Sequence, residues 1–68
     1  MTDREMKYQV GQQFLIRSDT ATLPFRVRIN AVDEPMNCYE LQKISDRCKF
    51  WLNEQQLENW IANVDNTR

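Results

Sequence analysis

The sequence predicts a mainly β fold (β-rich α+β): a small curled antiparallel sheet or barrel of four to five strands, followed by one C-terminal helix. Four short segments alternate apolar and polar residues, and this period of two is typical of half-buried strands. The last quarter changes to the spacing of an amphipathic helix, with apolar residues at 57, 60, 61 and 64. At 68 residues the chain is expected to form a single domain in which the helix covers the apolar face of the sheet.

The first two strands are predicted at residues 13–17 and 25–32. In the first, Phe14 and Ile16 face the core, and the single glycine, Gly11, is expected to bend the chain just before it. The second alternates without interruption. Its buried face is expected to carry Phe25, Val27, Ile29 and Ala31, and its outer face Arg26, Arg28 and Asn30.

The third and fourth strands are predicted at residues 39–44 and 48–52. Tyr39 and Leu41 face the core from the third strand. In the fourth, Cys48, Phe50 and Leu52 share the inner face, which leaves Lys49 and Trp51 on the other. Pairing Ile44 with Cys48 would leave Cys38 beyond the hairpin, so both cysteines are expected to be reduced, partly buried thiols.

A helix over residues 54–64 follows directly. Asn53 is suited to cap its first turn, and Leu52 and Leu57 are placed to form a hydrophobic staple across the cap. Residues 1–7 are expected to be flexible, residues 8–64 to form the β-rich domain and residues 65–68 to be a tail.

The composition excludes most catalytic chemistry. The chain has no histidine, no glycine-rich phosphate loop and no nucleophile elbow, and two thiols alone do not complete a zinc site. Asp33 and Glu34 are neighbours on a turn and are expected to face water. We therefore predict a non-enzymatic protein with no cofactor and no metal. The absence of a long apolar run or an apolar leader favours a cytoplasmic protein that does not enter membranes.

The order of apolar positions resembles small Src-homology-3-like barrels, especially the short ones encoded by bacteriophages and prophages. The residues concerned are Val10-Gly11, Phe14, the strand from Phe25, Tyr39-Glu40-Leu41, Phe50-Trp51-Leu52 and Leu57 to Ile61. The resemblance covers residues 8–62 and transfers no catalytic or binding residue. It implies an accessory protein that binds a host protein or a nucleic acid.

Two groups of residues are candidates for binding. Trp51, with Lys49 and Tyr8, is the candidate protein-binding set, because exposed aromatic residues are enriched at interface hot spots. Two alternatives for Trp51 stay open: the adjoining chain or the N-terminal residues cover its ring, or a bulge in the last strand turns it inward. Arg17, Arg26 and Arg28 form the candidate nucleic-acid-binding set, if Arg17 lies across from the other two on the sheet.

The alternative for the arginines is a solvated outer face, since residues 8–52 carry six basic and five acidic side chains, a surplus of one. An accessory or inhibitor protein that binds a host protein is the favoured function. A nucleic-acid-binding module is the second candidate, and a homodimer formed through a strand edge or Trp51 is the third.

Overall fold

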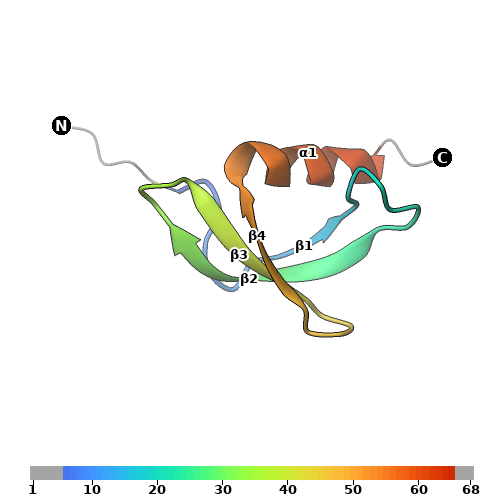
Figure 1. Ribbon diagram of the computed structural model, residues 1–68, viewed down its shortest axis with the longest axis horizontal. Helices are drawn as coiled ribbons and strands as arrows, with labels where there is room; N and C mark the ends of the chain where they lie inside the picture. Colours follow the sequence, from blue (N-terminus) through green and yellow to red (C-terminus); the bar gives the residue numbers. More distant parts are fainter. Residues whose placement is uncertain (1–5, 66–68) are drawn as a thin grey trace.

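The computed structural model describes residues 6–65, which form four strands and one helix. The strands pair in chain order as an antiparallel meander, and the helix lies over one face of the curled sheet (Figure 1). This confirms the predicted fold class. The elements are β1 (Gln13–Ile16), β2 (Phe25–Asp33), β3 (Cys38–Lys43), β4 (Lys49–Asn53) and α1 (Glu54–Asp65).

The bend before β1 depends on Gly11, as predicted. Its φ of 95° lies in the left-handed region, which an L side chain rarely adopts. The Gly11 amide donates to the Ile29 carbonyl at 2.9 Å, and the Ile29 amide donates to the Gln12 carbonyl at 2.9 Å. The bend therefore carries the chain into β1 while residues 11 and 12 stay bonded to β2.

Strand β2 contains a bulge that the alternation does not reveal. Ile29 and Ala31 occupy successive positions in the ladder with β3, so the register shifts across Asn30. Beyond the shift, Val32 packs against the core. Ala31 pairs with Glu40, which lies between buried Tyr39 and Leu41 on β3, so Ala31 lies on the outer side of the sheet. The predicted unbroken alternation, with Ala31 on the buried face, is therefore wrong after Ile29, because one inserted residue sends the following side chains to the opposite face.

The β3–β4 hairpin is one residue out of the predicted register. The Lys43 amide donates to the Cys48 carbonyl at 2.8 Å, so residues 44–47 form the turn and Ile44 does not face Cys48. Cys48 precedes β4 and is exposed, so the expectation that its thiol is partly buried is wrong, whereas Cys38 is half-buried as expected. Cys38 lies inside the ladder, opposite Asn53 and not beyond it. Both thiols are free, and they lie at opposite ends of the hairpin.

Helix α1 begins at the predicted residue and ends at Asp65, one residue later than expected. The Gln56 amide donates to Oδ1 of Asn53 at 2.7 Å, which confirms Asn53 as the cap. The Glu54 amide donates to the Asn37 carbonyl at 2.9 Å, which ties the start of the helix to the β2–β3 turn. Two of the unpaired amides of the first turn are thereby satisfied.

The core lies between the helix and the inner face of the sheet. Its buried side chains come from all five elements: Ile16, Val27, Ile29, Tyr39, Leu41, Leu52 and Leu57. Leu52 and Leu57 thus both enter the core on either side of the helix cap, as a hydrophobic staple requires. Trp60 and Ile61 also pack against this cluster but are only partly buried. The predicted inward positions of Tyr39 and Leu41 are confirmed.

The Tyr39 side chain reaches through the core to the start of the helix. Its hydroxyl donates to Oε1 of Glu54 at 2.9 Å and accepts from the Tyr8 amide at 3.2 Å. Burial raises the pKa of Tyr39 above its usual value, and the hydrogen bond to the Glu54 carboxylate acts in the same direction. One hydroxyl therefore connects β3, the segment before β1 and the helix.

The domain begins earlier than residue 8. Met6 packs against the core, and the Lys7 ammonium forms an ion pair with Glu58 on the helix, so these two residues belong to the folded unit. The rest of the segment expected to be flexible, residues 1–5, lies outside the described residues, as do residues 66–68 of the expected tail. Within residues 6–65, no helix has the length and apolar character needed to cross a membrane.

Candidate functional site

The sheet face opposite the helix brings together residues from both predicted binding sets. Arg26 and Arg28 alternate with buried Val27 and Ile29 on β2, so they point away from the core. Lys49 and Trp51 occupy the same face of β4 and are exposed. Their spacing follows from the pleat, which sends every second side chain outward.

The pairing register places these side chains in rows across the sheet. Gln13 pairs with Arg28, Arg28 with Gln42 and Gln42 with Lys49, which gives one row through all four strands. Because neighbouring strands lie about 4.8 Å apart, side chains in such a row are close enough to contact one ligand surface. We name this surface the outer face. It comprises Gln13, Leu15, Arg26, Arg28, Glu40, Gln42, Ile44, Arg47, Lys49 and Trp51.

Arg47 belongs to this face although neither predicted set includes it. It is the last residue of the β3–β4 turn, with a φ of 64°, and its carbonyl accepts a hydrogen bond from the Gln42 amide group at 3.2 Å. With Arg28 and Gln42 it lines a shallow depression of about 270 Å³. The sequence contains one indication that Arg47 lies on this face: Arg47 is in the turn between two strands whose Gln42 and Lys49 point outward.

The outer face is basic even though the chain as a whole is not. The ten residues named above include four cations, Arg26, Arg28, Arg47 and Lys49, and one carboxylate, that of Glu40, whereas the chain has a formal net charge of -1. A second carboxylate, Asp33, lies on the same side of the sheet at its β2–β3 end, where it pairs with Cys38. Within residues 6–65 none of these four cations has a carboxylate oxygen within 4.0 Å.

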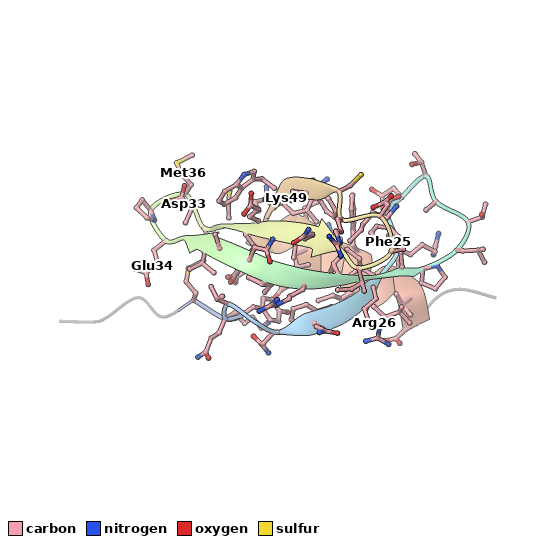
Figure 2. All side chains as sticks on the ribbon, turned by 90° about the horizontal axis from the view of Figure 1, so that it is seen from below. Phe25, Arg26, Asp33, Glu34, Met36 and Lys49 are labelled. Atoms are coloured by element: carbon pink, nitrogen blue, oxygen red, sulfur yellow. The ribbon has the colours of Figure 1, made fainter. Side chains whose placement is uncertain are left out.

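Most of the remaining carboxylates lie away from these cations, and Asp46, beside Arg47 in the β3–β4 turn, is paired with Lys43. Helix α1 carries Glu54, Glu58 and Asp65 and no basic residue. Asp33 and Glu34 occupy the β2–β3 end of the sheet, far from Arg26 and Phe25 at the other end (Figure 2). The fold thus separates charges that nearly cancel along the sequence.

Apolar side chains lie among these cations. Trp51 is 52% exposed, Ile44 48% and Leu15 41%. Leu15 pairs with Arg26 on one side, and the Ile44 amide donates to the Arg26 carbonyl at 3.0 Å on the other. The predicted outward orientation of Trp51 is confirmed. The outer face therefore offers apolar contact area and positive charge together.

Tyr8 does not join the outer face. Its ring packs edge-on against Phe14 at 4.9 Å and against Tyr39 at 5.6 Å, measured between ring centroids, and these partners face the core. Tyr8 is therefore a partly buried support of the core, on the helix side of the sheet. Its place beside Trp51 in the predicted protein-binding set is wrong, because the bend at Gly11 brings the preceding segment round to the inner face.

Arg17 is also absent from the outer face. Leu15, not Arg17, pairs with Arg26, and Gln13 pairs with Arg28. The Arg17 guanidinium instead donates to the Asn63 carbonyl of the helix at 3.2 Å and to the Ala21 carbonyl at 3.0 Å. Arg17 therefore joins the end of β1 to the helix and the β1–β2 loop, and the predicted row of three arginines does not form.

The inner side of the sheet has an open cleft beside the helix. It has a volume of about 700 Å³ and lies between the β1–β2 loop, the adjoining ends of β2 and β3, β4 and the helix. Aromatic rings form much of its surface, namely Phe25, Phe50 and Trp60. Its one charged lining residue among those the structure describes is Lys43. Sequence reasoning identified none of these residues as part of a site, because each is an ordinary inward-facing position of its strand or helix.

Metal-ligating side chains do not gather in the described part of the chain. Across residues 6–65 there is no group of three or more Cys, Asp or Glu side chains placed to hold an ion. Asp33 ends β2 and Glu34 begins the turn, where Glu34 is exposed as expected.

Comparison with known proteins gives no family to which this chain is assigned. No protein-family model, no curated protein and no solved structure matches it. The candidate sites therefore stand on the geometry of this chain alone.

Proposed function

We propose that this chain is a non-enzymatic accessory protein that binds an acidic surface of a partner protein through its outer face. The observation that supports the proposal is the gathering on one side of the sheet of Trp51 and four cations that have no ion-pair partner among residues 6–65. Tryptophan and arginine are the residue types most enriched at interface hot spots. Exposed apolar groups supply contact area, and the cations select a partner of opposite charge.

A protein partner is favoured over a nucleic acid by the apolar part of the face. Leu15 and Ile44 are aliphatic, so they give no ring on which a base stacks, and Trp51 is the one aromatic residue of the face. The four cations favour the nucleic-acid alternative, with Arg26 and Arg28 as its contacts. That alternative predicts strong salt dependence of binding, because phosphate contacts release counterions.

A homodimer through the outer face is disfavoured by its charge. A two-fold contact places the same surface on both subunits, so it would bring two sets of four cations together. Like charges across an interface oppose association. The homodimer alternative is thereby restricted to the edges of the sheet.

The proposal is tested by capture from a bacterial lysate with and without nuclease, using the parent chain and three variants. Trp51→Ala removes the indole, and Arg28→Gln removes one cation. Gln55→Glu is the matched control, because it makes the same change in net charge on the exposed side of the helix. We expect a protein partner that survives nuclease treatment and is captured by the parent and by Gln55→Glu.

Affinity measurements on the captured partner complete the test. Trp51→Ala should weaken binding by more than about 2 kcal/mol, about 30-fold, while the melting temperature stays close to that of the parent. Equal affinity for the parent and both outer-face variants would refute the proposal. Submicromolar binding to a single-stranded oligonucleotide near physiological salt, lost in Arg26→Ala/Arg28→Ala, would establish the nucleic-acid alternative instead.

A further inference from the structure

The open cleft on the inner side of the sheet has the features of a small-molecule site. Its volume of about 700 Å³ lies within the range of about 300–1,000 Å³ that such sites occupy. Such sites combine mainly apolar and aromatic walls with a few polar groups that orient the ligand. The cleft lies on the opposite side of the sheet from most of the outer face, and Lys43 lines both the cleft and the depression beside Arg47.

The aromatic wall is preformed. Phe25 and Phe50 meet edge to face with ring centroids 6.4 Å apart, and Phe50 and Trp60 lie 6.1 Å apart. All three rings rest on the core, which fixes their positions. The β1–β2 loop forms the opposite wall, where Leu23 is 74% exposed. An apolar group in the cleft would therefore contact aromatic surface on one side and an aliphatic side chain on the other.

The charge of the cleft determines the kind of polar group that fits beside this wall. Its lining contains no Asp or Glu among the residues that the structure describes, and its one ion is the Lys43 ammonium. That ammonium lies 4.9 Å from the centroid of the Phe25 ring and 3.4 Å from Oδ2 of half-exposed Asp46. An ammonium has three donors, and a single long contact with Asp46 leaves donors for a second partner. A cationic ligand would be repelled.

Trp60 contributes apolar surface rather than a hydrogen bond to the cleft. It lines the cleft, but its Nε1 is buried and does not open onto this space. The Lys43 ammonium is therefore the one charged donor of the lining among the described residues, and an acceptor of negative charge complements it.

We propose that the cleft binds a small aromatic carboxylic acid. Its ring lies against Phe25, Phe50 and Trp60, and its carboxylate is held by the Lys43 ammonium. Binding is non-covalent and needs no other component.

The test uses 4-phenylbutyrate as the probe and 4-phenylbutylamine as its cationic counterpart. Trp51→Phe leaves Trp60 as the one tryptophan of the chain, so its fluorescence reports on the cleft alone. We expect a saturable change in Trp60 emission with the acid and binding at least tenfold weaker with the amine. Equal responses to the two probes, or no saturable response to the acid, would overturn the proposal.

Variants of Lys43 then test whether its positive charge holds the carboxylate of the ligand. Lys43→Met keeps the aliphatic stem and should weaken binding of the acid at least tenfold, whereas Lys43→Arg should retain it. Lys49→Met is the matched control, because it removes the same charge from the outer face and should leave binding unchanged. Unaltered binding in Lys43→Met would overturn the proposal. Should Lys43→Met not fold, Lys43→Gln decides: it removes the charge but keeps a polar side chain, and unchanged affinity for the acid would overturn the proposal.

Discussion

Replacing Leu57 with alanine is the most direct test of how the helix is attached to the sheet. Leu57 is the one helix residue among those described that is fully buried, and its neighbours in the core come from every strand. Alanine has a higher helix propensity than leucine, so the substitution does not weaken the helix itself. Any loss of stability must therefore come from the core.

The expected loss is large relative to the stability of the domain. Truncating a fully buried leucine costs about 2–5 kcal/mol, through lost transfer free energy and the cavity that remains. A chain of 68 residues is expected to have a free energy of unfolding of about 3–10 kcal/mol. Leu57→Ala should thus remove about a fifth or more of that stability and lower the melting temperature by at least about 8 °C.

The assay is urea denaturation followed by circular dichroism at 222 nm, with two companion variants. Ile61→Ala truncates a partly buried side chain on the same stripe and should cost clearly less than Leu57→Ala. Gln55→Ala changes an exposed position and should stay within about 0.5 kcal/mol of the parent. A Leu57→Ala variant as stable as the parent would show that the helix is not docked on the sheet.

Three further predictions concern single residues. Because burial raises the pKa of Tyr39, the unfolded chain loses this phenol proton first as the pH rises. The contribution of the raised Tyr39 pKa to the free energy of unfolding is therefore complete below pH about 10 and is lost as the pH rises above it. Urea titrations from pH 8 to 11 should show this fall, and it should be smaller in Tyr39→Phe; an identical pH dependence would contradict the assignment. Gly11→Ala meets no atom within 4 Å but forces a side chain into a φ of 95°, so it should cost about 1–2 kcal/mol in the same assay. Thiol labelling of the native protein should modify exposed Cys48 faster than half-buried Cys38. After denaturation without reduction, two thiols per chain should be labelled. A count of zero in an intact monomer would show a disulfide.

The sequence alone determined the elements and most of the core. Alternation in four segments predicts the strands, because a half-buried strand must present one side chain in two to the interior. The cap at Asn53 and the stripe from Leu57 predict the helix and its buried side, since both follow from contacts within a few residues. Tyr39 as core and Trp51 as an outward residue follow from the same local rule.

The tertiary structure decided what local patterns do not encode. The bulge at Asn30 leaves the apolar pattern of β2 intact, so Ala31 and Val32 exchange faces without a sign in the sequence. The hairpin register depends on a four-residue turn that ends at Arg47 in a left-handed conformation, and this also places Arg47 on the outer face.

The candidate site was likewise only half predictable. Alternation places Arg26, Arg28, Lys49 and Trp51 on one face, because each belongs to a regular strand. Arg17 follows the end of β1, where hydrogen bonds to Asn63 draw it to the helix. Tyr8 precedes the bend at Gly11 and packs on the other side of the sheet. Both residues lie outside regular strands, where orientation is set by long-range contacts rather than by the period of the chain.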